Sequence, residues 1–466
     1  MRDYQIKVEP FSYIALRELT VEKQTGEHAR AIVRIHIADD KKDEYKNRLI
    51  GQAEQWVKIA VTGEKGEQRT IFHGVVKGFG FKVRQHETEL WLELVSGTFL
   101  WDIQHHFRVY QDRSLTALAV GNFLSGGYAG SQLFAVSQSM PELGHVVIQY
   151  RETDWELVKR LASEHNQVLV PESWKQGSKY WIGMPEGRRQ TIEEGTVPEV
   201  IEDIGAYQRV ACNGLAGLQL HDTLELTYET REIYEMGDWI EYEGRRYYLH
   251  KLSSRYSGGE LVHHYYFKTM AGLVNRTIKN DRQRGCAFMA TVAEVDKDKV
   301  RIDVIGDESG RSERHWFTYE TVYSSPDGTG WYCMPEVGDR VRLYVPGDEA
   351  DSYVISSVHL ESSSDRQNPD YKSLKTKYGK EVLFTPDRLI MTNNKGMMIE
   401  LSDGSGIKII SDKDIVMQAE QNMTIASQGA SLLLAAQEHL QLKQGDGTTM
   451  TLKEDIAFTG GEFRMQ

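Results

Sequence analysis

Cysteine is scarce in this chain of 466 residues, which has only Cys212, Cys286 and Cys333. They are odd in number and far apart, so the sequence predicts neither a disulfide framework nor a zinc site. We expect buried, reduced thiols in a protein made in the cytosol. Proline is also scarce, with 10 residues against 41 glycines, which favours many tight turns and little helix.

Long apolar runs are absent. No stretch approaches the roughly 18 apolar residues that a membrane-spanning helix needs, and residues 1–7 contain no apolar segment of the kind found in signal peptides. Basic residues are outnumbered, with 55 Lys and Arg against 68 Asp and Glu and a net charge of −13. This balance argues against nucleic acid as the main partner, because phosphate binding needs clustered positive charge.

The first 280 residues read mostly as strands. Apolar and polar residues alternate at 31–37, 56–61 and 89–95, which predicts a small antiparallel barrel over residues 1–110. Residues 200–275 return to strand, with a hairpin around Glu243-Gly244, and we expect a second barrel paired with the first.

Two helices are predicted between these barrels. The first begins after Ser114 as N-cap and ends at Gly126-Gly127. The second opens with a capping box, in which Thr153 is the cap and Glu156 the third helical residue.

A second domain is predicted over residues 281–365, after a polar, basic linker at 275–285. Five short strands at 287–295, 299–305, 314–319, 340–345 and 352–358 are separated by Gly, Asp and Pro turns. This pattern is typical of an OB-fold barrel, in which closure removes exposed strand edges. A further polar linker at 362–369 separates it from a third domain, residues 366–466.

The third domain carries a hidden repeat of apolar pairs, with steps of 8, 8, 8, 9, 8, 8 and 8 residues between successive pairs. The predicted core positions are Ile399, Leu401, Ile407, Ile409, Ile415, Met417, Met423, Ile425, Leu432, Leu434, Leu440, Leu442, Met450, Ile456 and Phe458; Thr448 is a weak member. A spacing of two places both side chains of a pair on one face of a strand.

Each octad offers only about two apolar side chains, too few to fill a closed coil of one chain. Such units need stacking partners to bury their apolar face. The sequence therefore predicts an intertwined β-helix of three identical chains, whose pairs meet on the common axis. The alternative is an ordinary antiparallel meander whose regularity is accidental.

Two stretches carry a family resemblance. One is residues 149–161, Gln-Tyr-Arg-Glu-Thr-Asp-Trp-Glu-Leu-Val-Lys-Arg-Leu, which lead into the second predicted helix. The other is residues 330–348, with Pro335-Glu336-Val337-Gly338-Asp339 before a strand and Gly347-Asp348 after it. The first resembles the hub domain, and the second the OB domain, of the VgrG family and of the fused tail-hub and tail-needle proteins of contractile-tailed phages. The order of hub, OB barrel and needle in that family also resembles the order of the predicted domains and covers nearly the whole chain.

The resemblance implies a mainly β fold: two hub barrels with short helices (residues 1–280), an OB-fold barrel (281–365) and a trimeric β-helix needle (366–466). It implies a non-enzymatic, trimeric spike of a contractile injection apparatus, joining the inner tube to an envelope-puncturing needle. The implied partners are Hcp-like tube and baseplate proteins, a PAAR-like tip cap or effector, and the target envelope. We expect synthesis in the bacterial cytoplasm without a signal peptide, then assembly at the tip of an injection particle that exposes or ejects the spike on firing. No lysozyme domain fits between barrel and needle.

Motifs that carry chemistry are few, and we expect no catalytic, cofactor-binding or metal-binding residue. The pairs His105-His106 and His263-His264 place neighbouring side chains on opposite strand faces, which disfavours a shared metal. His439 is expected to face solvent. Neither Gly78-Phe79-Gly80 nor residues 126–130 has the spacing of a phosphate loop.

Two other functions stay open at this point. The chain could be a phage-tail cell-wall hydrolase that uses a pair of its many carboxylates. It could also be a tail fibre that binds surface glycans through exposed aromatic residues, although residues 399–458 contain only one aromatic residue, Phe458.

Overall fold

The computed structural model describes residues 5–52, 54–63, 66–84, 87–137, 139–193, 197–212, 217–273, 276–359, 366–452 and 456–459. The chain divides into two compact units, Met1–Leu360 and Glu361–Gln466. Among the described residues, no helix has the length and apolar content needed to cross a membrane.

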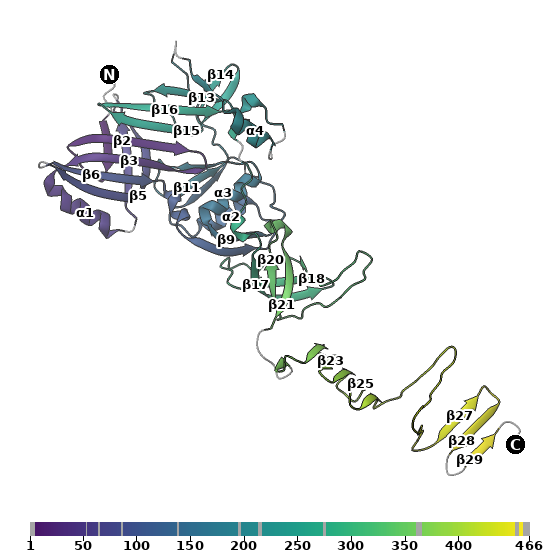
Figure 1. Ribbon diagram of the computed structural model, residues 1–466. Coiled ribbons are helices and arrows are strands. Elements are labelled where there is room, and N and C mark those ends of the chain that lie inside the picture. The colour runs from purple at the N-terminus through teal and green to yellow at the C-terminus, as the bar shows by residue number, and fades with distance from the viewer. Residues whose placement is uncertain are drawn as a thin grey trace. The chain divides into compact units, whose positions relative to one another are not determined.

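An antiparallel sheet of eleven strands dominates the beginning of unit 1 (Figure 1). Its strand order is β1-β4-β5-β6-β3-β2-β15-β16-β13-β12, and β14 pairs with β15. The strands are β1 (Gln5–Glu9), β2 (Ala15–Gln24), β3 (Glu27–Ile37), β4 (Trp56–Thr62), β5 (Gln68–Arg84), β6 (Glu87–Val95), β12 (Glu199–Ile201), β13 (Glu225–Thr230), β14 (Trp239–Tyr242), β15 (Arg245–Ser257) and β16 (Glu260–Lys268).

The two predicted barrels are two lobes of this one sheet. Alternate side chains of β3 are buried, as expected from the period-two pattern, and they pack into a core formed by the first lobe. Strands β13 to β16 surround a second core. The lobes join where β2 pairs with β15, from Leu19 opposite Tyr256 to Gln24 opposite Lys251. The predicted hairpin turn is confirmed, because Glu243 and Gly244 separate β14 from β15 with φ of 48° and 74°.

Four α-helices lie in the described part of the chain, two more than predicted: α1 (Lys42–Gly51), α2 (Ala117–Ser125), α3 (Asp154–Glu164) and α4 (Ile204–Cys212). The predicted N-cap of α2 is wrong. Ser114 is bound to Asp112 instead, and the side chain of Thr116 accepts the capping hydrogen bond from the N–H of Ala119.

Helices α2 and α3 share a core with small strands of the same region. These strands are β8 (Gln132–Ala135), β10 (Leu169–Glu172) and β11 (Lys179–Ile182), which form one sheet, and β7 (His105–Tyr110) and β9 (Val147–Thr153), which form another. The predicted capping box of α3 is confirmed. Thr153 Oγ1 accepts from the N–H of Glu156 at 3.1 Å, and Glu156 Oε2 accepts from the N–H of Thr153 at 3.0 Å.

A five-stranded barrel closes unit 1. Its strands are β17 (Ala287–Asp296), β18 (Lys299–Val304), β19 (Phe317–Thr318), β20 (Arg340–Tyr344) and β21 (Tyr353–Val358), in the order β19-β18-β17-β20-β21. A parallel bridge between Tyr319 and Val354 joins the two end strands, so the barrel closes as expected for an OB fold. Strand β19 is shorter than the predicted 314–319. The barrel core also contains Val109, Val146 and Ile148, which precede the barrel in sequence.

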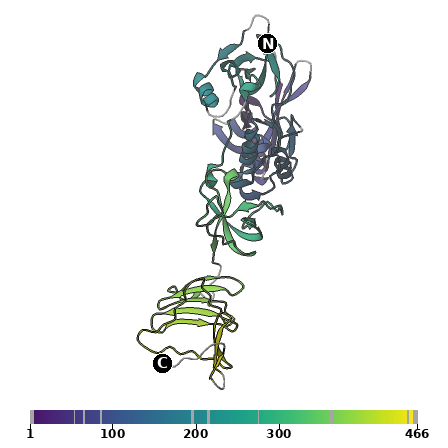
Figure 2. The same ribbon diagram turned by 90° about the vertical axis from the view of Figure 1, so that its right-hand side faces the viewer.

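Unit 2 contains two separate sheets. The first is an antiparallel meander of β22 (Lys372–Lys375), β23 (Glu381–Thr385), β24 (Arg388–Thr392), β25 (Met398–Ser402) and β26 (Gly406–Ile410). Figure 2 shows these strands side by side, in green to yellow-green. The second is formed by β27 (Leu440–Gln444), β28 (Thr448–Leu452) and β29 (Ile456–Thr459). Residues 411–439 lie between them and form no strand.

The three cysteines are free, as predicted. Their predicted burial is wrong: Cys212 and Cys333 are exposed, and Cys286 is half-buried. Cys212 ends the short helix α4 and Cys333 lies in a loop before β20, so neither belongs to a strand face that turns inward.

Candidate functional site

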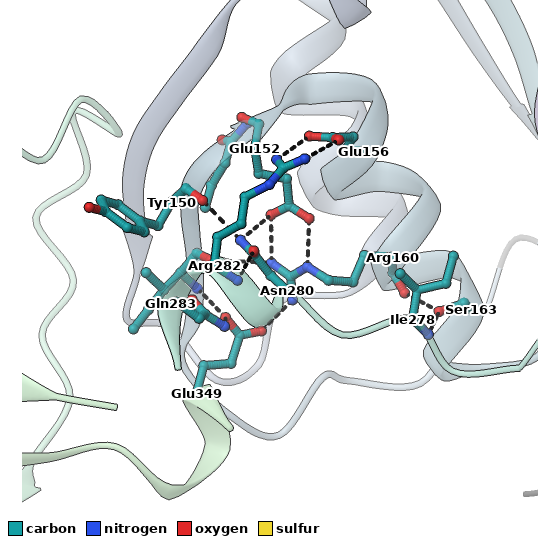
Figure 3. Close-up of polar contacts among 12 residues, drawn as sticks. Tyr150, Glu152, Glu156, Arg160, Ser163, Ile278, Asn280, Arg282, Gln283 and Glu349 are labelled. Atoms are coloured by element: carbon teal, nitrogen blue, oxygen red, sulfur yellow. Dashed lines mark hydrogen bonds and ion pairs between the residues drawn. The ribbon is translucent and has the colours of Figure 1, made fainter. Parts of the chain in front are cut away.

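A buried arginine, Arg160 of α3, joins the helical region to the five-stranded barrel (Figure 3). Its Nε and Nη2 donate to the two carboxylate oxygens of Glu152 at 2.8 and 3.0 Å. Its Nη1 donates to Oε1 of Glu349, the first residue of the 3-10 helix η6 (Glu349–Asp351). These three side chains, which we name the junction cluster, are each at most 5% exposed.

The charge of Arg160 survives burial because two carboxylates surround it. Burial alone would lower the pKa of the guanidinium, but the attraction of Glu349 and Glu152 outweighs it and raises the pKa. Bidentate arginine–carboxylate pairs are among the stronger and more directional polar contacts in proteins. The bidentate pair therefore fixes α3 against β9, and the single bond from Nη1 to Glu349 extends the cluster to the barrel.

Backbone and linker contacts surround the cluster. Oε2 of Glu349 accepts from the N–H of Ile148 at 2.7 Å and from Nε2 of Gln283 at 3.0 Å. Arg282 donates two hydrogen bonds of 2.8 Å to the carboxylate of Glu156, nearer the surface (Figure 3). The segment that enters the barrel is attached to α3 and β9, because Arg282 bonds to Glu156 and the side-chain amide of Asn280 donates to the carbonyl of Tyr150 at 3.0 Å.

A histidine beside the cluster tests whether a metal ion fits here. Ligand atoms of His145, Glu164 and Glu349 lie within 4.8 Å of one another. However, His145 has an acceptor at each ring nitrogen, Glu164 Oε2 and the carbonyl of Val146, both at 2.9 Å. The hydrogen bond to Glu164 raises the pKa of His145. The oxygens of Glu349 are already used by Arg160 and Ile148, so the group suits an imidazolium and not a metal.

The second candidate site is an apolar face in unit 2, which we name the repeat face. Cross-strand neighbours form one row through Leu374, Val382, Met391, Ile399 and Ile409. A second row runs through Phe384, Leu389, Leu401 and Ile407. The repeat face begins at Leu374, upstream of the first predicted pair, Ile399 and Leu401. At the other end of the face, Ile409 is 56% exposed.

The predicted core positions lie largely at the surface of a single chain. Eleven of them are between 41% and 71% exposed: Ile399, Leu401, Ile407, Ile409, Ile415, Met417, Met423, Ile425, Leu432, Leu434 and Leu442. Leu440 and Met450 are half-buried. The side chains of Ile456 and Phe458 lie outside the described residues, although their backbones pair with Leu452 and Met450.

The chain brings together only some of the predicted pairs. Ile399 and Leu401 lie opposite Ile409 and Ile407 across β25 and β26, and Leu442 lies opposite Met450. The three pairs at 415–434 fall in the segment without strands. One chain alone therefore supplies neither backbone partners nor cover for the middle of the repeat.

No protein-family model and no curated protein matches the sequence. Solved structures do match. An Escherichia coli component of the type VI secretion system, c3393, described as similar to the phage T4 tail proteins gp27 and gp5, has a TM-score of 0.56 at 13% identity, covering 76% of this chain and 100% of its own. The half-lidded Francisella PdpA–VgrG complex has a TM-score of 0.58 at 8% identity, covering 88% of both chains.

This chain has the VgrG-type fold. A third structure, the lidless PdpA–VgrG complex, matches with a TM-score of 0.57 at 9% identity over 88% of this chain and 98% of its own. The expected resemblance is thus confirmed for the fold. The junction cluster takes Glu152 and Arg160 from the first stretch that carried the resemblance, and Glu349 follows directly after the second stretch.

A hydrogen-bonded relay in the hub has the order of a catalytic triad. Thr98 Oγ1 lies 2.8 Å from Nδ1 of His28, whose Nε2 lies 3.3 Å from Asp102 Oδ2. A nucleophile must reach its substrate, but Thr98 is 0% exposed. Asp102 is also bound by Thr153 Oγ1 at 2.6 Å, so the relay ties the sheet to the cap of α3.

The histidines in the two predicted pairs have separate partners. His106 Nδ1 contacts Glu308 of the OB barrel at 2.9 Å, while His263 Nδ1 contacts Ser254 Oγ at 2.6 Å and His264 contacts Glu229. His106, His263 and His264 thus each contact a different side chain of the protein. His439 is exposed, as predicted.

The glycines of Gly78-Phe79-Gly80 serve packing in the hub sheet. A Cβ at Gly80 would lie 2.3 Å from Nε1 of Trp91 on the neighbouring strand. The ring of Trp91 therefore covers the backbone of β5, which explains the glycine without any phosphate.

Proposed function

We propose that three copies of this chain form the central spike of a contractile injection apparatus. In this role the hub joins the inner tube, and the repeat forms a needle that punctures a membrane or envelope. The role is mechanical and not catalytic. Stiffness and a defined geometry are the properties that such a part requires.

The observation that carries the proposal is the exposure of the predicted core positions in a single chain. Burying one Val, Leu, Ile, Phe or Met side chain contributes about 1.5–3 kcal/mol. Eleven predicted core side chains are more than two-fifths exposed, and ten of them, from Ile399 to Leu434, are consecutive positions of the predicted repeat. Contiguous apolar surface of this extent marks an interface in a folded protein.

Three copies would provide hydrogen-bond partners for the backbone in the middle of the repeat, as well as cover for its apolar side chains. Residues 411–439 form no strand within the chain, whereas buried backbone N–H and C=O groups need partners. Chains wound around one axis supply those partners to each other, and the pairs at 415–434 then face the axis. A dimer that covered only the first meander would leave these octads unpaired.

The fold neighbours support the setting of this spike. One is a type VI secretion component described as similar to phage tail proteins, and another is VgrG in complex with PdpA. By analogy, Hcp-like tube and baseplate proteins bind the hub end of our chain. A PAAR-like tip cap or an effector binds the C-terminal end, and nucleic acid is not a partner. The chain is made in the bacterial cytoplasm and joins the tip of the particle, which exposes or ejects it on firing.

Light scattering on the purified full chain tests the proposal. A trimer has three times the 53.3 kDa of one chain, about 160 kDa, and should resist SDS and heat. A monomer whose C-terminal region is folded and protected from protease would contradict it. The hydrolase alternative predicts turnover of peptidoglycan by the same sample, and the fibre alternative predicts binding to surface glycans.

A further inference from the structure

The loop between β19 and β20 of the OB barrel is a built hairpin, residues 319–337, which we name the barrel hairpin. Ser324 and Gly330 form an antiparallel bridge. The N–H of Trp331 donates to the carbonyl of Tyr323 at 2.8 Å, and the N–H of Ser325 donates to the carbonyl of Thr329 at 2.8 Å. Its shape is therefore set by its own backbone.

The turn and the base of the hairpin are also fixed. Asp327 Oδ1 accepts from the N–H and the hydroxyl of Thr329 at 3.0 and 2.7 Å. At the base, the hydroxyl of Tyr332 donates to the carbonyl of Lys297 at 2.9 Å. A hairpin so well anchored presents its side chains in one arrangement.

Those side chains are large, apolar and exposed. Val322 is 91% exposed, Tyr332 73%, Trp331 62% and Tyr323 52%. Aromatic residues such as Trp and Tyr are the commonest anchors of protein interfaces, and single exposed apolar residues need no explanation, but a cluster does. The barrel hairpin therefore has the character of an interface element.

Its charge identifies the kind of surface that would cover it. Residues 319–337 contain three acidic residues, Glu320, Asp327 and Glu336, and no Lys or Arg. An aromatic surface with acidic neighbours suits arginine, whose planar guanidinium stacks on rings and pairs with carboxylates.

The same barrel carries a surface of this kind, which we name the arginine face. Arg340 and Arg342 point outward from β20, where burial alternates, and within the described residues neither has an ion-pair or hydrogen-bond partner. Arg342 lies between Met289 of β17 and Ile355 of β21, both half-buried. Two free cations thus flank a small apolar surface.

We propose that the barrel hairpin of one copy docks on the arginine face of the next copy. The two surfaces differ, so the contact is head-to-tail, and three such contacts close a ring about a threefold axis. This inference rests on the trimer proposed above. It names a second interface, on the barrel, in addition to the repeat face.

Photo-cross-linking of the full chain tests the contact. Trp331 is replaced by p-benzoylphenylalanine, the purified protein is irradiated, and cross-linked peptides are identified by mass spectrometry. We expect a link between two chains that maps to residues 338–358. The same probe at Ile50, which is 64% exposed on α1, should give no link to that peptide.

A charge reversal provides the second arm. Arg342→Glu should lower the yield of the inter-chain link by about tenfold or more, as expected for loss of an interface anchor. Arg209→Glu, at an arginine of α4 that is 73% exposed, should leave the yield unchanged.

The outcomes separate this inference from the proposed function. In one set of outcomes, light scattering shows a trimer while the probe at Trp331 links only within its own chain, links to another region, or gives no link. Any of these results overturns the docking contact alone. A monomer by light scattering overturns the trimer and the docking contact together.

Discussion

Replacing Arg160 with alanine removes the guanidinium that lies between two buried carboxylates. Glu152 and Glu349 are 5% and 2% exposed, so without the guanidinium two carboxylates would face each other with little access to bulk solvent. Breaking a buried ion pair by removing one partner costs about 3–5 kcal/mol. This corresponds to roughly a hundredfold or greater increase in the population of the opened junction.

Hydrogen exchange measured by mass spectrometry on the full chain gives the assay. The N–H of Ile148 donates to Glu349 at 2.7 Å and the N–H of Ile278 donates to Ser163 Oγ at 2.8 Å, so both amides report on opening between hub and barrel. In Arg160→Ala we expect their protection to fall by roughly a hundredfold. The loss of protection should be smaller at pH 5 than at pH 8, because burial raises the pKa of Glu152 and its carboxylate, no longer paired with Arg160, takes up a proton on acidification.

Arg282→Ala is the matched control. Arg282 and Glu156 are 47% and 37% exposed, and an exposed pair contributes about 1 kcal/mol or less, which limits the change in protection to roughly fivefold. If Arg160→Ala changed protection no more than Arg282→Ala does, the junction cluster would not hold the barrel, and the reasoning would be wrong.

Three further substitutions test other parts of the fold. Ile409→Asp should abolish the trimer in light scattering, because three like charges near one axis cost several kcal/mol. Ser373→Asp, on the opposite face of the sheet, should leave the trimer intact. A stable Ile409→Asp trimer would show that Ile409 does not face the common axis. Thr153→Ala should lower stability to urea by about 1 kcal/mol through loss of the α3 cap, and an unchanged midpoint would contradict the capping role. The hydrogen bond to Glu164 raises the pKa of His145, so its stabilisation is full below the ordinary pKa of about 6.5 and is lost as pH rises through the raised value. The melting temperature should therefore fall more between pH 6 and pH 9 in the parent chain than in His145→Gln, and equal falls would show that His145 does not titrate there.

Local signals in the sequence predicted local structure well. The alternation at 31–37 became β3, and the capping box at Thr153 and Glu156 became the start of α3. Both signals depend on residues a few positions apart. Helix α1 was missed because only Tyr45 and Leu49 are buried in it, a single i, i+4 pair in a polar segment that gives too short a periodic pattern.

Contacts between distant residues gave no such signal. Arg160 and Glu349 are 189 residues apart. The sequence around a charged residue does not show which distant residue it will pair with in the fold. Both lie in or next to the stretches that carried the family resemblance, so the resemblance located the region but not the cluster. The pairing of β2 with β15, which merges the two lobes into one sheet, is equally non-local.

The repeat face was found only in part. From Val382 to Leu389 is 7 residues and from Leu389 to Ile399 is 10, so a search for steps of eight begins at Ile399. The meander nevertheless places Val382, Met391 and Ile399 in one row. Turn lengths set the sequence spacing, whereas strand register sets the row, and only the register decides which side chains share a face.

The barrel takes part of its interior from outside its own sequence, since Val109, Val146 and Ile148 pack into its core. A cut of the chain at residue 280 would remove these side chains from the barrel and expose apolar surface on both pieces. An exchange of the C-terminal unit between chains of this fold is therefore best made after residue 360, where the first compact unit ends. The barrel then stays with the side chains that fill it, and the repeat is moved by itself.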